Sequence, residues 1–164
     1  IDELSNYFDN LKVKKIKANH FLFNTGYAII EINKKKEILI MLKFYQCNHC
    51  KQIIIKLEDK KVPVFCCGEA MKELIPNSTD AAGEKHVPVI EQNGNLVKVS
   101  VGSDAHPMLD VHYITMVILE TNLGYQVKHL KPEMEPVAYF TLNEGEEVVN
   151  AYEYCNLHSL WSAR

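Results

Sequence analysis

The sequence predicts a mainly β protein, in which a seven-stranded antiparallel β-sandwich or barrel follows a small cysteine-bearing unit. Beyond residue 77 the chain consists of short runs rich in Val, Ile and Tyr, separated by turn residues such as Asn93-Gly94 and Asn143-Glu-Gly145. Regular spacing of such runs is typical of an antiparallel sandwich or barrel of about seven strands. Four of the five cysteines lie within residues 47–67, which indicates a separate unit ahead of these strands.

Residues 1–40 carry different signals from the rest of the chain. Apolar residues recur at helical spacing near the start, with acidic side chains early and lysines late, so we expect a short helix there. Two strands are expected next, at Tyr27–Ile32 and Glu37–Leu42. No methionine precedes Met41. Either Met41 is the natural start and 1–40 is an extension of unknown role, or the chain is a processed or truncated product.

Residues 41–77 are predicted to form a small metal-binding domain. A unit of roughly this size is too short to be held together by an apolar core alone. A bound metal can supply the missing stability, because its binding free energy becomes folding free energy in such a unit. The clustered cysteines offer the ligands for that metal.

Residues 78–164 are predicted to form the β domain, after a polar linker at Asn77–Asp80. No helix of normal length is required in this part of the chain. The expected strands are Val87–Gln92, Leu96–Val101, His112–Glu120, Tyr125–Leu130, Val137–Leu142 and Val148–Tyr154.

Composition excludes several classes of function. The chain of 164 residues is 47% hydrophobic and 24% charged, with a net charge of -3, and it has no basic run interleaved with aromatics, so nucleic acid is not an expected partner. No apolar window is long enough to span a membrane. The first residues are acidic and lack the pattern of a secretory signal, so a cytoplasmic location is expected. In a reducing cytoplasm, an odd number of clustered cysteines favours metal ligands over disulfides.

The first candidate metal site, which we call the cysteine site, consists of Cys47, Cys50, Cys66 and Cys67. Four thiolates in a tetrahedral set select zinc or iron. Neighbouring residues on an extended strand point to opposite sides, so Cys66 and Cys67 can share one ion only if the backbone bends between them. A zinc ribbon is an alternative, although ribbons normally use a second Cys-x-x-Cys pair. His49 is expected to face solvent, because four sulfurs already fill the tetrahedral shell.

The second candidate, which we call the histidine site, consists of His86, His106, His112, His158 and the lone Cys155. His106 and His112 are six residues apart, so on an extended segment both would project to the same face. Cys155-Asn-Leu-His158 places a thiolate and an imidazole within one turn. Imidazoles with one thiolate suit iron, copper or zinc, and five protein ligands would leave a sixth octahedral position open. His20 and His129 lack such company and are expected to be ordinary side chains.

These motifs together resemble desulfoferrodoxin, the family of two-iron superoxide reductases. The resemblance spans residues 41–164, and residues 1–40 have no counterpart in it. The matching segments are Cys47-Asn-His-Cys50, Cys66-Cys67-Gly-Glu-Ala-Met71, Gly83-Glu-Lys-His-Val-Pro88, His106-Pro-Met108, His112-Tyr-Ile114 and Tyr154-Cys-Asn-Leu-His158-Ser-Leu-Trp161.

The resemblance implies a desulforedoxin-like domain followed by an immunoglobulin-like β domain, usually as a homodimer. It implies one iron in the cysteine site and a second, square-pyramidal iron with four equatorial histidines and an axial Cys155. The implied activity is the one-electron reduction of superoxide to hydrogen peroxide, with electrons from a rubredoxin-like donor, as a defence against oxidative stress. The cysteine-bound iron would be an electron-transfer or structural accessory.

The resemblance also assigns roles to two residues that precede the first histidine. Lys85 would attract the superoxide anion and supply a hydrogen bond to the developing product. Glu84 would displace the product as a sixth ligand. Without the resemblance, Glu84 and Lys85 would be interpreted as residues of a solvent-exposed turn. One departure is Ser159, where many members have glycine; that change could tune the loop that holds the thiolate.

Two other functions compete with superoxide reduction. A zinc-ribbon binding module would hold zinc in the cysteine site and no redox-active metal in the histidine site. A different oxidoreductase, such as a superoxide dismutase or a peroxide- or oxygen-using iron enzyme, could use the same ligands. A dismutase returns oxygen from half of its superoxide, whereas a reductase consumes one external electron for each superoxide.

Overall fold

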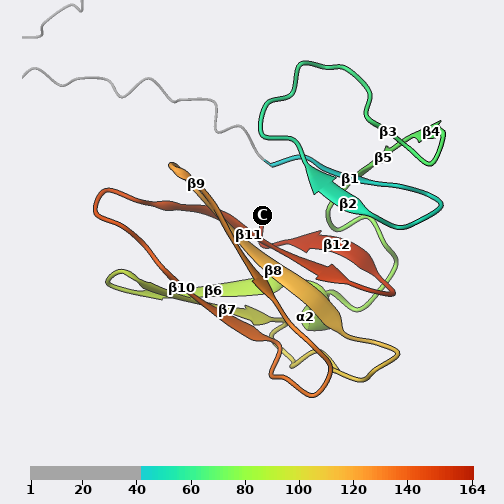
Figure 1. Ribbon diagram of the computed structural model, residues 1–164. Helices are drawn as coiled ribbons and strands as arrows, with labels where there is room; N and C mark the ends of the chain where they lie inside the picture. Colours follow the sequence, from blue (N-terminus) through green and yellow to red (C-terminus); the bar gives the residue numbers. More distant parts are fainter. Residues whose placement is uncertain (1–41) are drawn as a thin grey trace, which may run out of the picture. The chain divides into compact units, whose positions relative to one another are not determined.

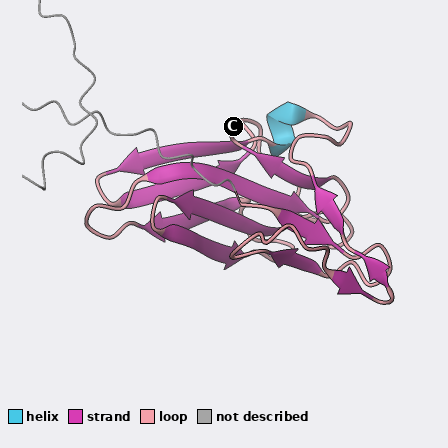
Figure 2. Ribbon diagram, turned by 90° about the horizontal axis from the view of Figure 1, so that it is seen from above, coloured by secondary structure: helices cyan, strands magenta, loops and turns pink. Residues whose placement is uncertain are grey.

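The computed structural model describes residues 42–164, which form a mainly β structure with one short helix, α2 (Gly83–His86) (Figures 1 and 2). The helix and strands expected within residues 1–40, and the role of that segment, lie outside the described residues. The strands are β1 (Phe44–Gln46), β2 (Ile53–Ile55), β3 (Phe65–Cys66), β4 (Glu69–Ala70), β5 (Lys72–Leu74), β6 (Pro88–Asn93), β7 (Leu96–Val101), β8 (Ile114–Thr121), β9 (Gly124–His129), β10 (Val137–Thr141), β11 (Val148–Cys155) and β12 (Ser159–Ser162).

Strands β6 to β12 form two antiparallel sheets, with strand orders β10-β7-β6 and β12-β11-β8-β9. Strand β7 alternates strictly: Val97, Val99 and Val101 are buried, whereas the residues between them are partly exposed. These valines pack with residues of the other sheet, including Val117 and Leu119 of β8, in one continuous core. The predicted seven-stranded sandwich is therefore confirmed.

The segment that carries the cysteines forms a small sheet, β2-β1-β5, and the two-stranded ribbon β3-β4. Phe44 of β1 is 1% exposed and packs against Ile118, Tyr152 and Leu160 of the larger sheet. Strand β8 therefore contacts the sandwich core on one face and Phe44 on the other. This double coverage explains why most residues of β8 and β11 are buried on both faces of the sheet.

The predicted strands of the β domain are all present, and their ends move by no more than two residues. One correction affects the site. His112 was expected within a strand, but β8 begins at Ile114, and His112 forms only an isolated bridge with Leu109. The segment from His106 to His112 folds back on itself, so its two histidines do not share a strand face. Within residues 42–164, no helix is long and apolar enough to cross a membrane.

Candidate metal centres

The cysteine site is assembled in the small unit, where its four sulfur atoms all lie within 4.8 Å of one another. The Sγ of Cys66 lies 3.6 Å from the Sγ of Cys50 and 3.9 Å from the Sγ of Cys67. Four sulfurs held at 2.3 Å around one tetrahedral ion are about 3.8 Å apart. The sulfur spacing therefore fits a single zinc or iron ion.

The neighbouring Cys66 and Cys67 can bind the same ion because the backbone bends at Cys67. Cys67 has φ of 52° and Gly68 has φ of 86°, so both residues lie in the left-handed region. This turn between β3 and β4 brings the sulfur of Cys67 to the side of Cys66. The bend that the sequence required is confirmed.

The ionisation of the thiols at the cysteine site also favours a bound cation. Backbone N–H donation, chiefly from Cys50, lowers the pKa of Cys47 to about 6, so this thiol ionises readily. The neighbouring sulfurs of Cys50 and Cys47 raise the pKa of Cys66 to about 12, which opposes a second negative charge. A bound cation would relieve that repulsion. His49 is exposed and lies 3.3 Å from a carboxylate oxygen of Glu69, outside the sulfur set, as predicted.

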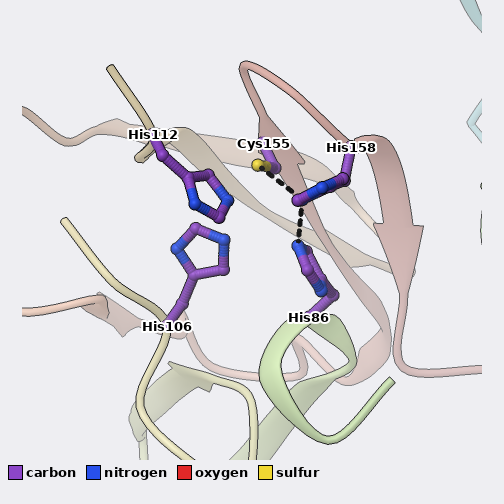
Figure 3. Close-up of side chains that lie close together, drawn as sticks. All are labelled: His86, His106, His112, Cys155 and His158. Carbon is purple, nitrogen blue, oxygen red and sulfur yellow. Dashed lines mark hydrogen bonds between the residues drawn. The ribbon is translucent and has the colours of Figure 1, made fainter. Parts of the chain in front are cut away.

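The histidine site brings together all five predicted residues, whose candidate ligand atoms lie within 4.8 Å of one another (Figure 3). His86 ends α2, His106 and His112 lie in the loop between β7 and β8, Cys155 ends β11, and His158 lies in the turn before β12. Three separate segments thus converge on one point, because Cys155 and His158 belong to the same β11–β12 turn. His129, which the sequence set aside, lies in β9 and is exposed.

Hydrogen bonds decide which ring nitrogens can face a metal. Nδ1 of His86 donates to the carbonyl of Ala82 at 2.8 Å, and Nδ1 of His106 donates to the carbonyl of Pro107 at 2.6 Å. Both rings therefore present Nε2 as the free lone pair. Nε2 of His106 and of His112 is buried without a hydrogen-bond partner. An unpaired buried nitrogen is costly, and a metal ion would satisfy it.

The imidazole of His158 faces the site with Nδ1 instead of Nε2. Nδ1 of His158 lies 2.9 Å from Nε2 of His86 and 3.6 Å from Sγ of Cys155. Adjacent nitrogens bound at about 2.1 Å to one ion lie roughly 3 Å apart, so the 2.9 Å spacing fits shared coordination. The residues of this site thus fit a metal ion, bound by Nε2 of three histidines, Nδ1 of His158 and one sulfur.

Burial favours the neutral, metal-binding form of three of the four imidazoles. Desolvation is the main reason that the pKa values of His86 and His112 are lowered, and it lowers the pKa of His106 to about 4. Burial raises the pKa of Cys155, whereas backbone N–H groups of His158 and Leu157 act in the opposite direction. A bound cation would therefore be needed to hold Cys155 as a thiolate.

A glycine that the sequence did not single out fixes the position of α2. Gly102 has φ of 81°, and a Cβ atom there would lie 2.7 Å from the carbonyl oxygen of Glu84 and would also meet the oxygen of Asp104. The backbone N–H of Asp104 donates to the same carbonyl of Glu84 at 2.9 Å. This close approach holds the turn that carries Glu84, Lys85 and His86. A buried, left-handed glycine cannot be distinguished from an ordinary turn glycine in one sequence.

Two further side chains orient the ligands. Asn156 joins the two ligand loops, because its Oδ1 accepts from the backbone N–H of Tyr113 at 2.9 Å and its Nδ2 donates to the carbonyl of Val111 at 3.0 Å. Trp161 stacks on the ring of His86 with a centroid distance of 4.9 Å, and its Nε1 donates to the carbonyl of His158 at 3.0 Å. Both residues hold ligands in place without offering a ligand atom.

Glu153 is a further residue that sequence reasoning missed. It lies two positions before Cys155 on β11, is completely buried, and neither of its carboxylate oxygens has a hydrogen-bond partner. Burial raises its pKa to about 9, so the carboxyl is neutral at pH 7. The group therefore adds no negative charge beside the histidine site at that pH.

Ser159 is strained, and replacing it with glycine should stabilise the fold. Its φ of 65° lies in the left-handed region, which is costly for a residue with a Cβ atom. We expect Ser159→Gly to raise the free energy of unfolding by up to about 1 kcal/mol, after the greater freedom of glycine in the unfolded chain is counted. Chemical denaturation measures this. Ser100→Gly, at a paired and extended position of β7, is the matched control and should destabilise the fold. Equal effects at both positions would show that Ser159 is not strained.

Comparison with known proteins identifies the family of this chain. The desulfoferrodoxin family profile matches residues 78–164. A desulfoferrodoxin homologue of Archaeoglobus fulgidus is 41% identical over 123 residues, which cover 75% of this chain and 97% of that protein. Desulfoferrodoxin of Nitratidesulfovibrio vulgaris is 44% identical over 121 residues, which cover 74% of this chain and 94% of that protein.

A solved structure has a similar fold. The crystal structure of the superoxide reductase from Treponema pallidum superposes with a TM-score of 0.65 at 39% identity, covering 76% of this chain and 99% of that chain. The match therefore extends over the small unit as well as the sandwich. With its cysteine and histidine residues gathered into two sites that each fit iron, this chain belongs to the desulfoferrodoxin family.

Proposed function

We propose that this protein is a superoxide reductase, which converts superoxide, one electron and two protons into hydrogen peroxide at the histidine site. The observation that carries this proposal is the convergence of four imidazoles and one thiolate within 4.8 Å. The similarity to the Treponema pallidum superoxide reductase over nearly all of that chain supports it. The zinc-ribbon alternative leaves the buried, unpaired nitrogens of His106 and His112 without an explanation.

Each ligand has a role in this proposal. The histidine site would hold one iron through His86, His106, His112, His158 and Cys155, and the cysteine site would hold a second iron. The iron in the histidine site would supply a one-electron couple between its ferrous and ferric forms. Imidazoles bind metals as neutral ligands, so Cys155 would be the only anionic ligand, and its charge would favour electron donation toward the substrate.

Lys85 and Glu84 are proposed as the residues that handle the anions. Both lie exposed on α2, directly before His86. The pKa of His112 is lowered mainly by burial and then by His158 and His86, and the charge of Lys85 adds a smaller contribution in the same direction. A fixed cation there would draw superoxide to the site and stabilise negative charge on the product. The Glu84 carboxylate would then compete with the product for the sixth coordination position of the iron.

Removing the lysine charge should slow the encounter with superoxide. We expect Lys85→Ala to lower the second-order rate constant by about tenfold at low salt and to weaken its dependence on ionic strength, because electrostatic steering is screened by salt. Pulse radiolysis measures both quantities, and iron analysis should find both metals retained. Lys60→Ala, which removes an exposed charge from the small unit, is the control. An unchanged rate in Lys85→Ala would remove this residue from the mechanism.

The remaining proposals concern organisation and partners. We propose that residues 41–77 form the desulforedoxin-like domain, that residues 78–164 form the reductase domain, and that 1–40 are an extension. A small rubredoxin-like protein would supply electrons, and the protein would act as a homodimer in the cytoplasm. Size-exclusion chromatography with light scattering would test the dimer.

Metal analysis followed by product stoichiometry tests the proposed function. Two irons per chain are expected, each with a sulfur-to-metal absorption band that is visible when its iron is ferric and fades on reduction. The reduced protein should then yield one hydrogen peroxide per superoxide without releasing oxygen. Oxygen from half of the superoxide would identify a dismutase instead. Zinc alone, without visible colour, would overturn the proposal in favour of a binding module.

A further inference from the structure

One side-chain hydrogen bond connects the immediate neighbours of the two metal sites. Nε2 of Gln46 donates to the phenol oxygen of Tyr154 at 2.6 Å, across 108 positions of sequence. Gln46 directly precedes Cys47, and Tyr154 directly precedes Cys155. Among the side-chain hydrogen bonds of residues 42–164, this bond alone joins a neighbour of a cysteine-site residue to a neighbour of a histidine-site residue.

The cysteine site has an outer and an inner side. Cys50 and Cys67 are exposed, whereas Cys47 is 2% exposed. A protein that delivers an electron can approach the exposed sulfurs, but the buried sulfur of Cys47 is the one next to Gln46. The hydrogen bond therefore begins on the inner side of the cysteine site.

The far end of the bond also leads to a thiolate ligand. Tyr154 is bonded through its backbone to Cys155, the only sulfur in the histidine site and a fully buried residue. Electronic coupling weakens less through covalent bonds and short hydrogen bonds than across gaps between atoms. A continuous series of covalent bonds, closed by this one hydrogen bond, runs from Cys47 through the Gln46 side chain and the Tyr154 ring to Cys155.

Packing keeps this series in place. Tyr154 packs against the cluster formed by Phe44, Ile118, Tyr152 and Leu160, and Phe44 belongs to the same strand as Gln46. The carbonyl of Tyr154 accepts a hydrogen bond from Oγ1 of Thr115 at 3.2 Å. The Tyr154 ring and the backbone of Gln46 are therefore held by neighbours other than each other.

We propose that Gln46 and Tyr154 form the route by which an electron passes from the cysteine site to the histidine site. The cysteine-bound iron would be oxidised from ferrous to ferric, and the histidine-bound iron would be reduced from ferric to ferrous, with no proton transferred and no covalent bond changed. A one-electron donor protein would then reduce the cysteine site again. This proposal rests on the proposed function, because it describes how the reductase recovers its electron.

The test removes one atom of the route and measures the transfer directly. In the protein with both irons, a flash-generated reductant reduces the cysteine-bound iron while the histidine-bound iron is ferric, and the visible bands of the two irons follow the electron. We expect Tyr154→Phe, which keeps the ring but removes the hydroxyl, to slow the transfer severalfold. Reduction potentials and visible spectra should stay unchanged, which a disturbance of either metal site would not allow.

Two kinds of variant make the test specific. Gln46→Leu interrupts the same hydrogen bond from the other side, and the double variant should be no slower than either single variant, because both remove one bond. Tyr45→Phe is the matched control: it removes a hydroxyl from the same strand, β1, whose partner is Glu73 at 3.4 Å. The control should transfer the electron at the rate of the unmodified protein.

The outcomes separate this proposal from the proposed function. Unchanged transfer rates in both Tyr154→Phe and Gln46→Leu, or no transfer in the unmodified protein, would overturn the route. Superoxide consumption by the fully reduced protein in a single turnover needs no transfer between the sites, so it tests the reductase activity alone. If that activity is absent while transfer slows in the variants, the proposed function fails and the route remains.

Discussion

Replacing Cys155 with serine is expected to abolish superoxide reduction and the visible absorption of the oxidised histidine site. Cys155 supplies the only sulfur of that site and is completely buried. A serine hydroxyl in the same place does not ionise, so the metal would lose its anionic ligand and the sulfur-to-metal transition that gives the colour. Pulse radiolysis and visible spectra of the oxidised protein measure the two losses.

The control for this prediction lies in the other site. Cys50→Ser should alter the absorption of the cysteine site and leave the band of the histidine site in place, because Cys50 belongs only to the former. Iron analysis of Cys155→Ser distinguishes a changed ligand from a lost metal. A Cys155→Ser protein that kept both its absorption and its activity would show that the sulfur is not a ligand.

Glu153→Gln is expected to stabilise the metal-free protein, and to do so more at pH 8 than at pH 5. Burial raises the pKa of Glu153 from 4.5 to about 9. The folded protein therefore keeps a proton that the unfolded chain releases. The stability from this proton is fully present below about pH 4.5 and is lost as the pH rises toward 9. At pH 7 the difference is on the order of 3 kcal/mol, which a neutral glutamine of similar shape would recover.

Chemical denaturation of the metal-free protein at the two pH values measures this effect. Glu91→Gln is a suitable control, because Glu91 lies exposed on β6 and makes only a surface ion pair with Lys98. Glu91→Gln should change stability little at either pH. An equal effect of Glu153→Gln at pH 5 and pH 8 would mean that Glu153 does not hold a proton in the folded protein.

The strands of the sandwich could be predicted from sequence because their signals are local. Alternating valines define β7, and Asn93-Gly94 defines the turn before it. The ligand residues could be predicted because clustered cysteines and histidines have few other uses. Their positions could not be derived in the same way: His112 reaches the site from a folded loop, not from the strand face that its spacing from His106 indicated.

The supporting residues could not be predicted, because their roles depend on contacts between distant segments. Asn156 looks like an ordinary loop residue until its side chain is seen to join the loop of His112. Glu153 looks like a surface residue, since a strand of a two-layer sandwich normally has one solvent face. The small unit covers part of the outer face of that sheet. Apolar residues therefore occur on both faces of β11, and the usual alternation of apolar and polar residues, which would have marked Glu153 as inward-facing, is lost.

The separation of the ligands along the chain has a consequence for how the protein acquires its colour. His86 and His158 meet across 72 positions, whereas Cys47 and Cys66 are only 19 apart. Closing a long loop costs more entropy, and distant contacts form later during folding than local ones. A refolding chain supplied with iron should gain the absorption of the cysteine site first. The second band should appear only when both sheets have docked, so it reports completed folding.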